Sequence, residues 1–128
     1  MDQEKRKILV IDDSITNVVL LNAILSEEGY EIITVFNVSD AFNEMNKHFP
    51  DLVLLDLQMP VLDGFDFLEK IKSKNRYKDI PIIVVTAYCD DANINKALSL
   101  GANDYIEKPI DIDQLYNKIS KTLNYACH

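Results

Sequence analysis

Five polar residues at the ends of apolar segments are of the types that bind cations and phosphoryl groups. In chain order they are Asp12, Asp13, Asp56, Thr86 and Lys108. Three carboxylates against one ammonium leave an excess of about two negative charges, and an oxygen-rich site of that sign suits Mg²⁺. Phosphoryl transfer mainly requires that the charge on the phosphoryl oxygens is neutralised, and a carboxylate can itself carry the phosphoryl group. Together these residues predict phosphoryl transfer at a Mg²⁺ site, with a carboxylate as the nucleophile.

Of these five residues, Asp56 is the one for which a purely structural role is hardest to justify. It ends the run Leu52–Asp56, in which the other four residues are apolar, and a loop rather than a helix start follows it. A carboxylate in that setting costs free energy unless it is paired or bound to a cation, which favours a functional role. Asp12 and Asp13 have a structural alternative, because one of them could cap the helix that follows, an interaction worth about 1 kcal/mol.

Thr86 and Lys108 carry weight only as members of the set. Threonine commonly ends strands and caps helices, and a lone lysine is most often a solvated surface residue. Pro109 strengthens the case for Lys108. An X–Pro bond in a tight turn can be cis and can thereby fix the direction of the preceding side chain.

Short runs rich in β-branched residues recur at intervals of roughly 20–30 residues, which is the spacing of strand–helix units. The five runs are Lys7–Ile11, Glu31–Phe36, Leu52–Asp56, Ile82–Thr86 and Asp104–Glu107. The first, third and fourth are almost wholly apolar, as expected of parallel strands covered on both faces. The fifth is short and mixed, so we place it at an edge of the sheet.

Segments with helical periodicity follow each of these runs. They are Ser14–Glu28, Val38–His48, Asp63–Asn75, Asp90–Leu100 and Asp111–Tyr125, with Phe49 extending the apolar face of the second. All four prolines fall between these predicted elements, as do Gly29 and Gly101, while Gly64 stands at the start of the third helical segment. Five such units predict an α/β fold with one doubly wound parallel sheet and helices on both faces. Ligands of such sheets bind beyond the carboxyl ends of the strands, where the five polar residues would meet.

Composition excludes several other classes of protein. The chain has 128 residues and a formal net charge of −8, which fits one globular domain and disfavours binding to nucleic acid or to a membrane surface. No apolar stretch is long enough for a signal peptide or a membrane span, so we expect a cytoplasmic protein. The two histidines and the two cysteines are His48, His128, Cys89 and Cys127. They are too few and too scattered for a site built on clustered His or Cys ligands.

Four sequence blocks, in this order and spacing, resemble the receiver domain of two-component response regulators. They are I-D-D-S at 11–14, D-L-Q-M-P-V-L-D-G at 56–64, V-T-A at 85–87 and Y-I-E-K-P at 105–109. The resemblance implies a flavodoxin-like domain of five strand–helix units with strand order 2-1-3-4-5. It also implies that residues 1–128 form a single receiver domain, with a core over about 7–123 and no output domain.

The resemblance assigns a role to each residue of the predicted site. Asp56 would be the phosphoacceptor. The ligands implied for Mg²⁺ are Asp12, Asp13, Asp56 and the backbone carbonyl of Gln58. Thr86 and Lys108 would bind the phosphoryl group from two sides. Tyr105 would change rotamer as Thr86 moves, although a packed strand aromatic is the structural alternative for this residue.

The implied function is that of a phosphorylation-activated switch in a phosphorelay. A sensor histidine kinase or a histidine phosphotransfer protein would donate the phosphoryl group to Asp56. The surface made by the fourth helix, the fifth strand and the fifth helix would then change, and it could also join two copies of the chain. Such a domain catalyses its own phosphorylation and dephosphorylation, but it is a switch rather than a turnover enzyme.

Three alternatives remain open on the residues alone. An electron-transfer flavoprotein shares the fold class, although two aspartates after the first strand would repel the flavin phosphate. A Mg²⁺-dependent phosphatase with an aspartate nucleophile typically has two acids that are two residues apart at the first strand, whereas Asp12 and Asp13 are adjacent. A receiver-like domain could also act as a phosphate-independent interaction module, although no residue of the site is missing.

Overall fold

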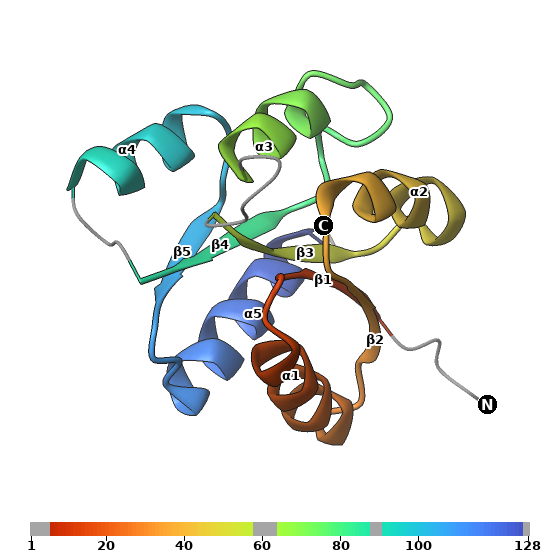
Figure 1. Ribbon diagram of the computed structural model, residues 1–128, viewed down its shortest axis with the longest axis vertical. Coiled ribbons are helices and arrows are strands. Elements are labelled where there is room, and N and C mark those ends of the chain that lie inside the picture. The colour runs from red at the N-terminus through yellow and green to blue at the C-terminus, as the bar shows by residue number, and fades with distance from the viewer. Residues whose placement is uncertain (1–5, 58–63, 88–90, 127–128) are drawn as a thin grey trace.

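A five-stranded parallel sheet, in the order β2-β1-β3-β4-β5, forms the centre of the protein. The computed structural model describes residues 6–57, 64–87 and 91–126. Its strands are β1 (Lys7–Ile11), β2 (Glu31–Val35), β3 (Leu52–Asp56), β4 (Ile82–Thr86) and β5 (Asp104–Glu107). Its helices are α1 (Ile15–Glu27), α2 (Val38–His48), α3 (Gly64–Lys72), α4 (Asp91–Ser99) and α5 (Ile112–Ala126). The predicted α/β class and the implied strand order are therefore confirmed (Figure 1).

Helices cover both faces of the sheet because successive strand residues point to opposite sides. Leu9 and Val84 belong to a core cluster shared with α2, α3 and α4, whereas Val10 and Val85 belong to a second cluster shared with α1 and α5. Figure 1 shows the same division of the helices between the two sides. β1, β3 and β4 are buried almost throughout, as expected of central parallel strands. None of the helices in the described ranges has the length and apolar character that crossing a membrane requires.

Two predicted boundaries around the second strand and helix differ from the structure. β2 ends at Val35, and Phe36, which we placed in the strand, is 44% exposed. α2 ends at His48, so Phe49 does not extend its buried face. Phe49 is instead the C-cap residue, with a left-handed backbone (φ 47°) and a side chain that is 48% exposed. In both places the apolar pattern continues for one residue beyond the point where the backbone leaves the element.

Candidate functional site

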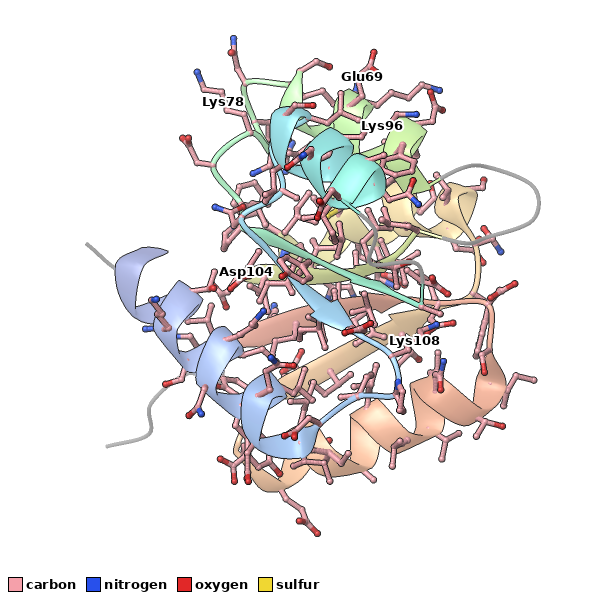
Figure 2. The ribbon with its side chains drawn as sticks, turned by 90° about the vertical axis from the view of Figure 1, so that its left-hand side faces the viewer. Glu69, Lys78, Lys96, Asp104 and Lys108 are labelled. Carbon is pink, nitrogen blue, oxygen red and sulfur yellow. The ribbon has the colours of Figure 1, made fainter. Side chains whose placement is uncertain are left out.

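The residues singled out by the sequence lie together at the carboxyl edge of the sheet. Asp12 follows β1, Asp56 ends β3 and Thr86 ends β4. Asp56 pairs with Val85 in the strand register, so Thr86 stands one residue further along the neighbouring strand. Lys108 follows β5, as Figure 2 shows, and its backbone N–H donates to the Thr86 carbonyl at 2.9 Å. The prediction that these side chains meet at one edge is confirmed by these placements.

Three carboxylates converge at this edge. Asp12, Asp13 and Asp56 each place one oxygen within 4.8 Å of the others. Asp12 and Asp56 are 2% and 3% exposed, whereas Asp13 faces solvent. Hard oxygen ligands with surplus negative charge are what Mg²⁺ prefers, and the exposed side of the cluster leaves room for water and for a phosphoryl oxygen. The donor set therefore fits Mg²⁺. Gln58, whose carbonyl the resemblance adds to the ligands, lies outside the described residues.

Lys108 brings a positive charge to the cluster. Its Nζ donates to Asp56 Oδ2 at 3.2 Å and lies 3.7 Å from Asp12 Oδ2, and its side chain is 20% exposed. The peptide bond between Lys108 and Pro109 is cis. Because one ammonium faces three carboxylates, the cluster keeps a surplus of negative charge that a divalent cation can neutralise.

The start of α1 holds Asp12 in place. Asp12 Oδ1 accepts a hydrogen bond from the N–H of Ser14 at 2.9 Å, and Oδ2 accepts one from Asn17 Nδ2 at 3.3 Å. Ser14 is the N-cap of α1, since its Oγ accepts from the N–H of Asn17. The alternative that Asp12 or Asp13 caps the helix is therefore wrong. Asn17 is not among the residues that the sequence predicts for the site. Its only signal in the sequence is an amide in the first helical turn, where side chains point back toward the N-terminus.

Burial raises the pKa of the Asp12 carboxyl above its ordinary value of 3.8, and the negative charge of Asp56 raises it further. The N–H of Ser14 and the ammonium of Lys108 act in the opposite direction without cancelling the effect of burial. The ionised form of Asp12 is thus disfavoured in the folded protein. At neutral pH this carboxylate costs folding free energy, which a cation bound at the cluster would offset.

Replacing Asp12 with asparagine is expected to raise the free energy of unfolding at pH 7 without Mg²⁺, by on the order of 1 kcal/mol. A carboxyl whose pKa is higher in the folded state loses stability as the pH rises through that pKa. The difference between Asp12→Asn and the wild type should therefore shrink as the pH falls toward 3.8. Urea unfolding at several pH values measures this difference. Asp13→Asn, which removes the same charge at an exposed position, should differ less from the wild type in its free energy of unfolding. An Asp12→Asn protein that is less stable than the wild type at pH 7 contradicts the prediction.

Gly64 packs directly against the backbone that carries Asp56. A Cβ atom at Gly64 would lie 2.7 Å from the carbonyl oxygen of Asp56 and 2.8 Å from Cα of Leu57. Gly64 is the first residue of α3, which agrees with its place at the start of the helix predicted over 63–75. The motif at 56–64 contains this glycine, but only the folded structure reveals that α3 approaches the end of β3 too closely for any side chain.

Tyr105 lies on β5, which is an edge strand as predicted. Its half-buried ring packs against the core cluster beneath α2, α3 and α4. Its register partner is Val84, two residues before Thr86 on β4. Strand residues two apart point to the same face, so Tyr105 and Thr86 share a face of the sheet. That arrangement allows a displacement of one side chain to affect the other.

The model of the response regulator receiver domain family matches residues 8–120. The sporulation initiation phosphotransferase F of Bacillus subtilis (strain 168) is 36% identical, over 91% of this chain and 93% of its own length. A probable transcriptional regulator ycf27 of Pyropia yezoensis is also 36% identical, over 98% of this chain but 51% of its own length. The chain thus spans about half the length of several curated relatives that it matches.

Solved structures agree with this assignment. A putative response regulator from Chloroflexus aurantiacus superimposes with a TM-score of 0.90 at 26% identity, covering 94% of this chain and 99% of that one. A two-component response regulator from Clostridium difficile gives a TM-score of 0.88 at 30% identity, covering 94% and 97%. The acidic cluster and the lysine beside it agree with the family model that matches most of the chain. This chain therefore belongs to the response regulator receiver domains.

Proposed function

We propose that this chain is a phosphorylation switch of two-component signalling and that Asp56 is its phosphoacceptor. The observation that carries the proposal is the setting of the Asp56 carboxylate. It is 3% exposed at the end of β3, 3.2 Å from the Lys108 ammonium and next to two further carboxylates. A buried acid that shares one ammonium with a neighbouring acid is costly to maintain for stability alone.

The chemistry is a transfer between a nitrogen and an oxygen. A carboxylate oxygen of Asp56 attacks the phosphorus of a phosphohistidine whose other ring nitrogen carries a proton. The P–N bond breaks, its electron pair stays on nitrogen, and the histidine leaves as neutral imidazole. Lys108 and the Thr86 hydroxyl hold the phosphoryl oxygens and stabilise the charge that they carry. Asp12, Asp13 and Asp56 would hold Mg²⁺, which when bound supplies further positive charge to the same oxygens.

The consequence of phosphorylation would be read at the surface formed by α4, β5 and α5. Thr86 moves toward the phosphoryl group, Tyr105 changes rotamer on the same face, and the equilibrium between two surface conformations shifts. This surface could also join two copies of the chain. A net charge of −8 disfavours direct contact of the domain with nucleic acid.

Incubation with acetyl phosphate tests the phosphoacceptor. The wild type is expected to gain the mass of one phosphoryl group when Mg²⁺ is present and none when Mg²⁺ is chelated. Asp56→Asn should gain none under either condition, while Asp51→Asn, at an exposed aspartate before β3, should behave as the wild type. Intact-mass spectrometry reads all of these outcomes. Equal labelling of wild type and Asp56→Asn contradicts the assignment, and no labelling of any protein favours a phosphate-independent interaction module.

An exposed apolar face beside the site suits a helical phosphodonor. Ile15 and Val19 lie four residues apart on α1, and their side chains are 68% and 61% exposed. Residues at this spacing share a helix face, and only the N-cap residue Ser14 separates the acidic pair at 12–13 from the start of α1. Adjacent exposed apolar side chains are typical of interaction surfaces. A kinase or phosphotransfer protein that docks here would bring its phosphohistidine to Asp56.

Replacing Ile15 and Val19 together by serine is expected to slow transfer from a phosphorylated histidine kinase or phosphotransfer domain at least about tenfold, because the docking contacts are lost. The rate with acetyl phosphate should stay unchanged, since this small donor needs no docking face. Leu98→Ser, at a 42% exposed site on α4, is the matched control. Radiolabel transfer and acetyl phosphate labelling measure the two rates, and a parallel loss of both would exclude a docking role.

A further inference from the structure

Two side chains from opposite faces of the sheet meet around the open edge of β5. Tyr105 packs against the core cluster on the face of α2, α3 and α4. Lys118 belongs to α5, which covers the other face. The Lys118 ammonium nevertheless lies 4.4 Å from the centre of the Tyr105 ring. The lysine stem therefore passes around the edge of β5, the strand turned toward the viewer in Figure 2, where Asp104 marks its first residue and Lys108 follows its last.

The ammonium is fixed by acceptors that do not belong to the ring. Lys118 Nζ donates to Asp104 Oδ1 at 3.2 Å and to the backbone carbonyl of Tyr105. Asp104 Oδ1 also accepts from the N–H of Tyr105 at 2.8 Å. The side chains of Lys118 and Asp104 are 21% and 32% exposed, so water only partly screens their ion pair. These contacts tie the positive charge to the backbone of the residue whose ring it covers.

A rotation of Tyr105 about χ1 would separate the ring from this charge. Staggered rotamers differ by about 120°, so any other rotamer moves the ring away while the ammonium stays bound to Asp104 and the Tyr105 carbonyl. A cation over an aromatic face at a partly exposed position is worth about a two- to fivefold change in population. Lys118 therefore stabilises the observed orientation of Tyr105 relative to the others by roughly that factor.

We infer that Lys118 is a positioning residue that holds Tyr105 in one orientation and thereby opposes switching. This inference rests on the proposed function, because it takes the rotamer change of Tyr105 as part of the response to phosphorylation. The observed orientation coexists with the direct ion pair between Lys108 and Asp56, which a phosphoryl group on Asp56 would replace. Phosphorylation and the rotated orientation of Tyr105 favour each other at equilibrium, so the rotated orientation is the one that accepts the phosphoryl group more readily in this scheme. Weakening the Lys118 contact raises the population of that orientation, and the rate of phosphorylation rises in proportion to this population.

The test compares Lys118→Met, which keeps an apolar stem but no charge, with Lys118→Arg, which keeps a cation. Lys121→Met is the matched control, because Lys121 is an exposed lysine on the same helix. Each protein is labelled with 3-fluorotyrosine, and the fluorine resonance of Tyr105 is assigned from its loss in Tyr105→Phe. The rate of phosphorylation by acetyl phosphate with Mg²⁺ is measured in parallel, also for Tyr105→Leu with and without the Lys118→Met change.

Lys118→Met is expected to shift the Tyr105 resonance and to speed phosphorylation about two- to fivefold. Lys118→Arg should stay close to the wild type in both measurements, and Lys121→Met should change neither. In the Tyr105→Leu background, Lys118→Met should have no further effect on the rate. An unchanged Tyr105 resonance in Lys118→Met, or an equal change in Lys121→Met, overturns the inference. If the wild type accepts no phosphoryl group, the proposed function fails and the coupling to switching fails with it, while the resonance still decides whether Lys118 orients Tyr105.

Discussion

Replacing Gly64 with alanine is expected to lower the free energy of unfolding by about 2 kcal/mol and to slow phosphorylation by acetyl phosphate about 100-fold. The added Cβ would lie 2.7 Å from the carbonyl oxygen of Asp56 and 2.8 Å from Cα of Leu57. Both contacts are backbone atoms at the end of β3, so no side-chain rotation relieves them. Either α3 or the end of β3 has to move, and the second movement displaces the Asp56 carboxylate from Lys108.

Helix propensity alone predicts that Gly64→Ala would raise the free energy of unfolding and not lower it. Alanine is favoured over glycine in a helix by roughly 0.5–1 kcal/mol, and Gly64 does not have a left-handed backbone that an alanine would strain. The steric conflict with β3 is larger than this gain, because overpacking a well-packed region costs about 1–3 kcal/mol and here the neighbours cannot rotate away. A Gly64→Ala protein that is more stable than the wild type would show that propensity decides at this position.

Gly29→Ala is the matched control for Gly64→Ala. Gly29 follows α1 with φ +90°, and a Cβ there would contact nothing within 4 Å. Alanine at Gly29 is therefore expected to cost about 1–2 kcal/mol through backbone strain alone. Its phosphorylation rate, measured where both proteins are folded, should equal that of the wild type. Urea unfolding and acetyl phosphate labelling separate the two effects, and a rate loss in Gly29→Ala as large as in Gly64→Ala would mean that destabilisation alone explains both.

The site residues that could be predicted from the sequence are those that stand at or just after the end of a predicted strand. Asp56 could be predicted because a single acid ends an otherwise apolar run, and the carboxyl ends of parallel strands share an edge. Thr86 and Lys108 followed by the same reasoning from the neighbouring runs. This inference needs only the approximate positions of the strands and a parallel sheet. It therefore does not depend on an error of one residue in an element boundary, such as the predicted end of the second strand at Phe36.

The contacts that the sequence did not predict all join two different elements, and the packing of those elements determines how closely they approach each other. Asn17 reaches Asp12 across the N-cap of α1, where the chain turns from β1 into the helix. Gly64 is required because α3 approaches the backbone of β3, and Lys118 meets Tyr105 only because β5 lies at the edge of the sheet. An amide in a helix, a glycine in a loop motif and a lysine on an amphipathic helix each have ordinary alternatives. Their roles depend on tertiary geometry that no local pattern records.

Replacing Lys108 with methionine is expected to have opposite effects on two properties of the site. The ammonium lies 3.2 Å from Asp56 and 3.7 Å from Asp12, whose carboxylates are almost completely buried. Its removal leaves both carboxylates without this cation, so phosphorylation by acetyl phosphate should slow at least about 100-fold. Mg²⁺ should nevertheless bind several-fold more tightly, because Lys108 and the metal compete to neutralise the same carboxylates.

Stability measured with and without Mg²⁺ tests this competition independently of catalysis. Without Mg²⁺, Lys108→Met should lower the free energy of unfolding by about 2 kcal/mol, less than the ~3–5 kcal/mol typical of breaking a buried pair, because the lysine side chain is 20% exposed. With saturating Mg²⁺ the deficit should shrink, since tighter binding to the folded variant stabilises it more than the wild type. Lys74→Met, which removes a charge from an exposed lysine after α3, should show neither effect. A deficit that stays constant in Mg²⁺, or weaker Mg²⁺ binding by Lys108→Met, would mean that the metal and Lys108 act on different groups and that the acidic cluster is not the Mg²⁺ site.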